Sequence, residues 1–243
     1  MVNNMINNIK DLIKIDKREV LRYLQYKNQN INDDLLKIIE QSIDETKRII
    51  SPRFVLRKYS IKKIKMDNEK DQVILEDGNL ILKSDDVYKL LTECDECILM
   101  AVTLGLEIEK EIRKLTYTNL TKGIIIDSCA TTAIEEVCDI VQDNIARKLL
   151  REDKYITYRY SPGYGDLSIE NNIYINNILN SQKEIGLTVT NSGIMIPRKS
   201  VVALIGVSNK GILNNKKSLY FLLKFVFLIQ FLNLYYLLYI LFV

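Results

Sequence analysis

The sequence predicts an α+β fold in which helices pack on a mainly antiparallel sheet. Two long segments, residues 16–50 and 122–150, carry apolar residues at helical spacing. Other segments contain short alternating apolar runs interrupted at residues 77–79 and 191–193 by glycine-containing turns, which is the pattern of β-hairpins. Because hairpins join antiparallel strands, these runs favour an α+β arrangement over a doubly wound parallel sheet.

The N-terminal third predicts a polar segment, two helices and a hairpin. Residues 1–15 form a polar, asparagine-rich segment without the apolar stretch of a signal peptide. Two helices separated by the polar sequence KNQNINDD account for residues 16–50, and Pro52 ends the second helix. From Phe54 to Leu82 alternating runs replace the helical spacing, which predicts strands.

The middle of the chain predicts a buried strand between helices. Ser84 is a suitable N-cap for a short helix, because its hydroxyl can accept a hydrogen bond from the first turn. The nearly unbroken apolar run at residues 98–104 predicts a buried strand. Gly105 separates this strand from another helix, and residues 122–150 then form a long helix with small residues near its start.

The last third predicts a strand, a loop, a helix and a hairpin. We expect a strand at residues 155–160, then a loop containing the sequence RYSPGYGD, then a helix that begins near Ser168. Alternation over residues 187–196 predicts the hairpin that completes the domain.

Composition narrows the possible chemistry. The chain has 34 basic and 31 acidic residues mixed along its length, so no strong electrostatic field favours nucleic acid. Histidine is absent, which excludes imidazole general bases, Ser-His-Asp triads and histidine metal ligands. We therefore expect no histidine-dependent catalysis and no metal site.

Four cysteines leave a zinc or redox site as an alternative to buried thiols. Cys94 and Cys97 have the C-x-x-C spacing, but a zinc site needs a second pair of ligands. Cys129 and Cys138 are nine residues apart on a predicted helix and so point to roughly opposite faces. We expect reduced cytosolic thiols that pack as small apolar side chains.

The glycine-containing loop at residues 159–166 has two readings. It can be a tight turn in which glycines adopt positive φ and Arg159 pairs with a nearby carboxylate. It can also be a ligand loop, in which glycines let the backbone approach a ligand while arginine binds a carboxylate. A dinucleotide fingerprint is disfavoured, because Ser168 occupies the third glycine position and a hairpin follows the helix.

Several segments together resemble a known family. The loop RYSPGYGD, the later stretch IGLTVTNSGIMIPRKSVVALIGVS, and the earlier stretches LMAVTLG and DSCATTAIEEVCD occur in the family's order. They resemble the activation domain of cobalamin-dependent methionine synthase in its stand-alone form. The resemblance covers residues 16–208 and implies a bent, mainly antiparallel sheet wrapped by helices.

The resemblance implies a function as well as a fold. Members of this family bind S-adenosylmethionine in a shallow groove beside the loop and donate its methyl group to inactive cob(II)alamin, with one electron from a flavodoxin-like protein. The chain has no segment like the cobalamin, folate or homocysteine modules. We therefore expect cobalamin to be held by a separate methionine synthase polypeptide or a related corrinoid protein, in the cytoplasm.

Carried over to this sequence, the resemblance assigns five loop residues to S-adenosylmethionine. Arg159 is expected to meet the carboxylate of the ligand, while Ser161 and Gly163 are expected to give main-chain contacts to its adenosine. Tyr164 would line the pocket, and Asp166 would hold the loop in place.

The sixth assigned residue comes from the long helix. An acidic side chain there is expected to face the ammonium or ribose of the ligand. Thr131 stands where the larger enzymes carry glutamate, so Glu135, one turn further on, is the residue assigned. The sequence also departs from the family at Leu204 and Ile205, where the larger enzymes place an aromatic ligand contact.

Residues 209–243 differ in character from the rest of the chain. From Leu219 onward they are predominantly apolar and long enough to span a bilayer. Three explanations stay open: a frameshifted end of an AT-rich gene, a C-terminal membrane anchor, or a buried helix. Two alternative functions also stay open. One is a non-catalytic S-adenosylmethionine-sensing or docking module, with or without a membrane tether, and the other, suggested only by residues 209–243, is a membrane-tethered structural protein.

Overall fold

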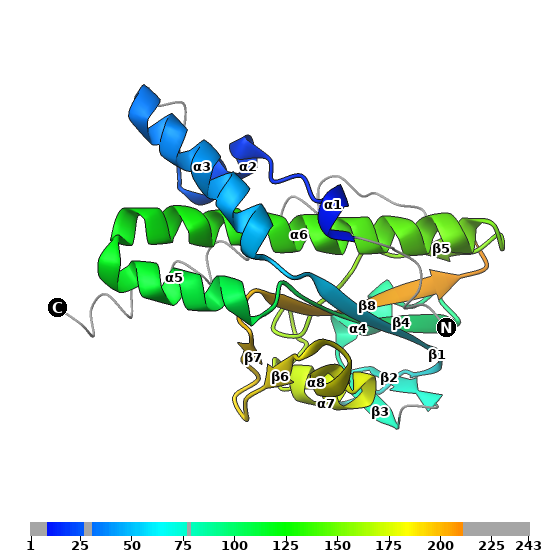
Figure 1. Cartoon of the computed structure of the whole chain (residues 1–243). Helices are drawn as coiled ribbons and strands as arrows, with labels where there is room; N and C mark the ends of the chain where they lie inside the picture. The colour runs from blue at the N-terminus through cyan, green and yellow to red at the C-terminus, as the bar shows by residue number, and fades with distance from the viewer. Residues whose placement is uncertain (1–8, 27–30, 77–78, 211–243) are drawn as a thin grey trace. The chain divides into compact units, whose positions relative to one another are not determined.

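The computed structural model describes residues 9–26, 31–76 and 79–210 (Figure 1). The helices are α1 (Ile9–Leu12), α2 (Lys17–Tyr23), α3 (Asp33–Ile49), α4 (Asp85–Leu90), α5 (Leu106–Thr118), α6 (Leu120–Leu150), α7 (Asn171–Leu179) and α8 (Ser181–Ile185). The strands are β1 (Arg53–Ile64), β2 (Gln72–Leu75), β3 (Leu80–Lys83), β4 (Glu96–Thr103), β5 (Tyr155–Ile156), β6 (Thr188–Val189), β7 (Met195–Ile196) and β8 (Ser200–Ser208).

Six of these strands form one antiparallel sheet in the order β3-β2-β1-β4-β8-β5. Strand β1 joins the two parts of the sheet, because residues 53–60 pair with β4 and residues 61–64 pair with β2. β4 lies between β1 and β8, and its apolar run is almost completely buried. The antiparallel sheet and the buried strand at residues 98–104 are therefore confirmed.

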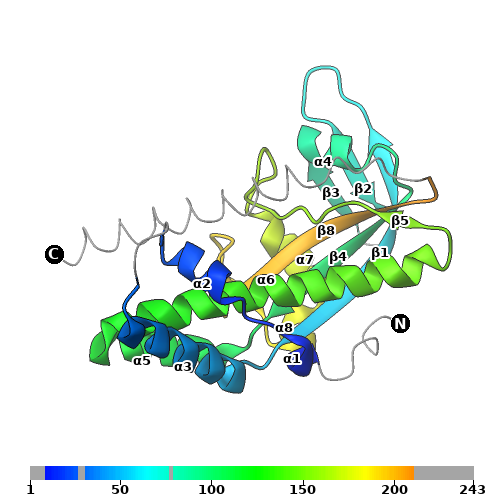
Figure 2. The same ribbon diagram turned by 90° about the horizontal axis from the view of Figure 1, so that it is seen from above.

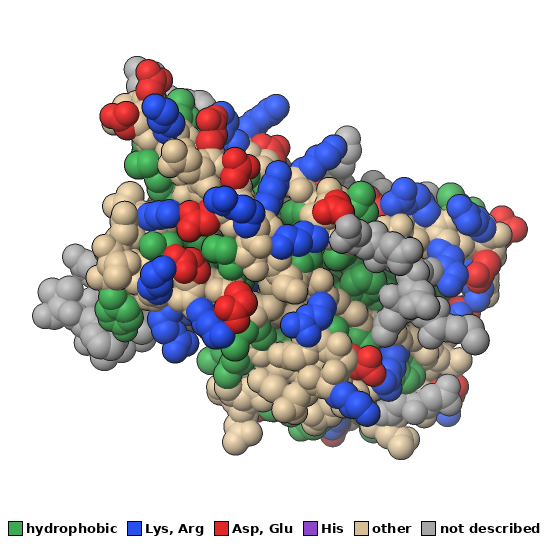
Figure 3. Space-filling model, in the orientation of Figure 1, with side chains coloured by type: hydrophobic (Ala, Val, Ile, Leu, Met, Phe, Trp, Pro, Cys, Tyr) green, Lys and Arg blue, Asp and Glu red, His purple; other side chains and the backbone are tan. Residues whose placement is uncertain are grey.

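Helices cover both faces of this sheet. α6 runs across β4 and β8 on one face, whereas α7 and α8 pack against β1 and β4 on the other (Figures 1 and 2). Asn119 caps α6, because its side-chain oxygen accepts a hydrogen bond of 3.1 Å from the Lys122 amide. On the face shown in Figure 3, acidic and basic side chains are interspersed.

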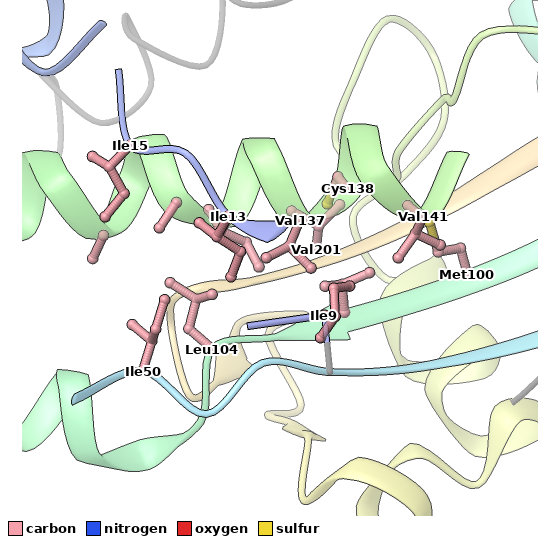
Figure 4. Packing of buried hydrophobic residues seen from close by; sticks show 14 of the residues in the cluster. Ile9, Ile13, Ile15, Ile50, Met100, Leu104, Val137, Cys138, Val141 and Val201 are labelled. Carbon is pink, nitrogen blue, oxygen red and sulfur yellow. The ribbon is translucent and has the colours of Figure 1, made fainter. Parts of the chain in front are cut away.

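The core between α6 and the sheet includes residues from the N-terminal segment. Ile9, Ile13 and Ile15 are buried there together with Met100 of β4 and Val137 of α6 (Figure 4). The polar composition of the first fifteen residues conceals these three isoleucines. These three isoleucines therefore pack in the core although they precede residue 16.

Two elements near the loop are shorter than the sequence pattern predicts. The strand expected at residues 155–160 ends at Ile156, because the Thr157 hydroxyl then accepts the Gly206 amide hydrogen bond at 2.8 Å. The helix expected after the loop is divided at Asn180, whose left-handed backbone (φ 53°) separates α7 from α8. The hairpin predicted at residues 187–196 is present as β6 and β7.

Among residues 9–26, 31–76 and 79–210, none of the helices has the length and apolar character needed to cross a membrane. The apolar run from Leu219 lies outside the described residues.

Burial on α6 predicts unequal effects of two isoleucine substitutions. Ile126 is 0% exposed, so Ile126→Ala should lower the free energy of unfolding by about 2–5 kcal/mol through lost contacts and a residual cavity. Ile124, two residues away, is 44% exposed, so Ile124→Ala should change the free energy of unfolding by only about 0.5 kcal/mol. Urea unfolding measures both values, and equal losses would contradict the packing of α6.

Candidate functional site

The loop that contains residues 159–166 is held against β8. The Tyr160 amide donates to the Leu204 carbonyl at 2.9 Å, and the Leu204 amide donates back at 2.8 Å. Thr157 likewise donates its amide to Gly206 at 3.0 Å. This pairing fixes the start of the loop relative to the sheet, and Arg159, which lies between these contacts, extends toward α6.

Arg159 binds three side chains on one face of α6. Its Nη2 lies 2.8 Å from Glu135, and its Nη1 lies 2.6 Å from Asp139 and 3.2 Å from Gln142. Residues spaced by four and three positions share a helix face, so one guanidinium can reach all of them. The Arg159 side chain is only 10% exposed.

The structure thus brings together two of the predicted site residues, Arg159 and Glu135. It also adds Asp139 and Gln142, which the sequence analysis did not assign. Asp139 follows Glu135 by one helical turn, and that spacing was the available signal. The three ionic side chains carry a formal excess of one negative charge, because two carboxylates face one guanidinium.

Two tyrosines lie within electrostatic reach of Glu135. Tyr164 of the loop is 8% exposed, and burial together with the Glu135 carboxylate raises its pKa, so the hydroxyl keeps its proton. Burial and the same carboxylate raise the pKa of Tyr23 to about 12. Arg22 lies 4.3 Å from the centre of the Tyr23 ring. Tyr23 comes from α2, and no sequence motif indicated that it belongs near the loop.

Part of the loop backbone is already hydrogen bonded. The Gly163 amide donates to the Leu167 carbonyl at 2.8 Å, and the Ser161 carbonyl accepts from the Tyr164 amide at 3.3 Å. Within the described part of the chain, the Ser161 amide and the Gly163 carbonyl form no hydrogen bond. These two groups are the ones that remain for the main-chain contacts expected from Ser161 and Gly163.

Asp166 joins the end of the loop to α4. Its carboxylate accepts hydrogen bonds from the Ser84 hydroxyl and from the amides of Asp85 (2.8 Å) and Asp86 (3.4 Å). Burial alone would raise the pKa of Asp166, but these hydrogen bonds and the nearby Lys70 lower it below the ordinary value. The side chain is therefore used to anchor the loop.

The cysteines are buried and free. Burial raises the pKa of Cys94 to about 11 and the pKa of Cys97 and Cys129 to about 12, and it raises that of Cys138 further still. All four therefore stay protonated near neutral pH. No group of three potential metal ligands occurs among the described residues.

Two surface cavities lie away from the loop. One, of about 570 Å³, is lined by residues of α1 and α8, the end of α3 and the start of β1. The other, of about 420 Å³, lies beside the last turns of α6 and is lined by Asn144, Arg147, Lys148 and Arg151. Neither of these two linings includes a residue of the loop.

The two loop glycines predict unequal effects of alanine. Both glycines have positive φ, and an alanine held in this backbone conformation would lower the free energy of unfolding by about 1–3 kcal/mol. At Gly163 the added methyl group would meet only Ile169, at 3.7 Å, whereas at Gly165 it would overlap the Asp86 carboxylate and the Tyr160 hydroxyl. Gly165→Ala should therefore lower the unfolding free energy more than Gly163→Ala in urea titrations. The reverse order would contradict this loop conformation.

The lowered pKa of Asp166 predicts a pH-dependent contribution to stability. A carboxyl whose pKa is lower when folded stabilises the fold above its unfolded pKa of about 3.9, and this contribution disappears as the pH falls through the folded value. Asp166→Asn should lower the unfolding free energy at pH 7 by about 1 kcal/mol.

Urea unfolding at several pH values measures the difference in unfolding free energy between the wild type and Asp166→Asn. This difference should become smaller below about pH 4. Asp67→Asn is the control, because this exposed carboxylate has no hydrogen-bond partner among the described residues. A constant difference across the whole pH range would show that the Asp166 charge is not involved.

Comparison with known proteins identifies the family. The family model described as "Vitamin B12 dependent methionine synthase, activation domain" matches residues 2–224. Among solved structures, the chain is similar to a crystal structure of the MetH reactivation domain bound to AdoHcy. The TM-score is 0.55, and the identity is 15% over 84% of this chain and 74% of that chain. At this identity the likeness shows a shared fold.

No curated protein matches the chain. The family match covers most of the sequence and extends beyond residues 16–208 at both ends. On this evidence, the chain belongs to the family of vitamin B12-dependent methionine synthase activation domains.

Proposed function

We propose that the chain binds S-adenosylmethionine beside the loop at residues 159–166. In this role it supports reductive methylation of cob(II)alamin on a separate methionine synthase or related corrinoid protein. The observation that carries the proposal is the pair of carboxylates around Arg159 next to a glycine-containing loop. Family membership and the AdoHcy bound to a related domain support it.

The groups around Arg159 suit the chemistry of this ligand. S-adenosylmethionine carries an ammonium and a sulfonium, and the excess negative charge of Glu135 and Asp139 favours both cations. Its carboxylate can bind the planar Arg159 guanidinium after replacing one of the protein carboxylates. The Ser161 amide and the Gly163 carbonyl are suited to the adenosine.

The contribution of the chain to the reaction is binding and orientation. A sulfonium methyl group already has a good leaving group, so the transfer needs no general base, in keeping with a sequence without histidine. Cobalamin, held by the partner, supplies the methyl acceptor, and a flavodoxin-like protein supplies one electron. The protonated Tyr164 adds an aromatic ring without a further negative charge.

We place the proposed reaction in the cytoplasm. A membrane-bound form depends on the apolar run from Leu219, which lies outside the described residues.

Binding of S-adenosylmethionine tests the proposal. Isothermal titration should show binding to the full chain, and Arg159→Ala should weaken it by about tenfold or more, which corresponds to about 1.4 kcal/mol. Glu135→Gln should also weaken binding, because it removes part of the excess negative charge. Arg147→Ala is the matched control, since Arg147 is exposed on the same helix and contacts only its own turn.

A second measurement separates methyl transfer from ligand sensing. The chain is mixed with a cobalt(II)-loaded corrinoid protein, a one-electron reductant and methyl-labelled S-adenosylmethionine. Label on cobalt supports the proposed reaction, and binding without label supports the sensing module. Absence of binding by the wild-type chain, or equal binding by Arg159→Ala, would overturn the assignment of the site.

A further inference from the structure

A second buried cation, Lys199, binds α6 two turns before the Arg159 contacts. Lys199 lies between β7 and β8, is 4% exposed, and places Nζ 2.9 Å from Asp127 and 2.7 Å from the Thr131 hydroxyl. Thr131 donates its own hydrogen to the Asp127 carbonyl at 2.9 Å, so its oxygen accepts from Lys199. The ammonium is thus bound to two consecutive turns of α6.

The partners of the two cations form a single line along α6. Asp127, Thr131, Glu135 and Asp139 follow one another at intervals of four residues and therefore lie along one side of the helix. One cation binds the first two members of this line, and Arg159 binds the last two. Asp127 is thus paired with Lys199, whereas Glu135 and Asp139 share Arg159 at the end of the line where we place the ligand.

Strand β8, together with the residue before it, contacts both α6 and the 159–166 loop. The backbone of Lys199 is held in the sheet, because its carbonyl accepts the Leu104 amide at 3.0 Å. Further along β8, Leu204 pairs with Tyr160 at the start of the loop. The residue before β8 therefore holds α6, and β8 itself holds the start of the loop through Leu204.

We infer that Lys199 is a positioning residue of the proposed site: it orients the ligand-facing turn of α6 relative to the 159–166 loop. A buried ion pair adds little net stability compared with well-packed apolar side chains, whereas its directional contacts define one arrangement. This inference rests on the proposed function for its link to S-adenosylmethionine. The claim that Lys199 orients Glu135 and Arg159 concerns the protein alone.

The test uses charge removal at Lys199 with matched variants of the full chain. Lys199→Met removes the ammonium and keeps the length of the side chain, Lys199→Arg retains the charge, and Lys199→Met combined with Asp127→Leu replaces the pair by apolar groups. Lys154→Met is the control for loss of an ion pair outside the α6 line, because Lys154 lies 2.8 Å from Glu96, which also binds Lys58.

Two readouts are measured for each variant. The first is the NMR signal of the Arg159 side-chain Nε–H in the absence of ligand, assigned by its loss in Arg159→Gln. The second is the dissociation constant and stoichiometry for S-adenosylmethionine. Lys199→Met should shift the arginine signal and raise the dissociation constant about threefold to tenfold at unchanged stoichiometry, and Lys199→Arg should restore most of the affinity.

The double variant distinguishes positioning from stability. It should unfold at nearly the wild-type urea concentration while its arginine signal stays shifted and its affinity stays reduced. The inference would be overturned if the double variant regained the wild-type arginine signal and affinity together with its stability. It would also be overturned if Lys199→Met left the arginine signal unchanged. If the wild-type chain binds no S-adenosylmethionine while the signal still moves, the proposed function fails and the positioning role stands. The double variant carries the test if Lys199→Met does not fold.

Discussion

The ion pairs between Arg159 and the carboxylates of α6 are the contacts on which the candidate site depends. A guanidinium that is 10% exposed is costly to bury unless its charge is compensated and its N–H groups are hydrogen bonded. Glu135 and Asp139 meet both requirements from consecutive turns of one helix. The loop, the helix and the sheet beneath them are therefore positioned together, and none of the three can move far without uncovering a buried charge.

The sheet contributes rigidity to this arrangement. β8 is paired with β4 and holds the loop through Leu204. Lys199, the residue before β8, contacts α6 through Asp127. At the other end of the loop, Asp166 binds the first turn of α4 through charge-assisted hydrogen bonds. The loop is therefore anchored at both ends, and a segment held in this way would lose little conformational entropy on binding the proposed ligand.

Much of the fold was predictable because its signals are local. Helical spacing located α3 and α6, and glycine-containing turns located the hairpins, so the α+β class followed from periodicity. The boundaries near the loop were less accurate, because the Thr157 hydroxyl and the left-handed Asn180 replace regular pairing with specific local contacts. The core positions of the three isoleucines in the N-terminal segment were not predicted. That segment is polar in overall composition, and composition does not show which of its few apolar residues pack in the core.

The residue types and spacings of the chain were sufficient to indicate the family, the loop and the two residues Arg159 and Glu135 that meet across it. They were not sufficient to assign Asp139, Tyr23 or Lys199 to the same region. Tyr23 belongs to α2, Asp139 to α6, and Lys199 to the segment before β8, so their proximity depends on how these separate parts of the chain pack. Contacts between distant segments leave no periodic trace in a sequence, because they arise from the burial of whole faces rather than from neighbouring residues.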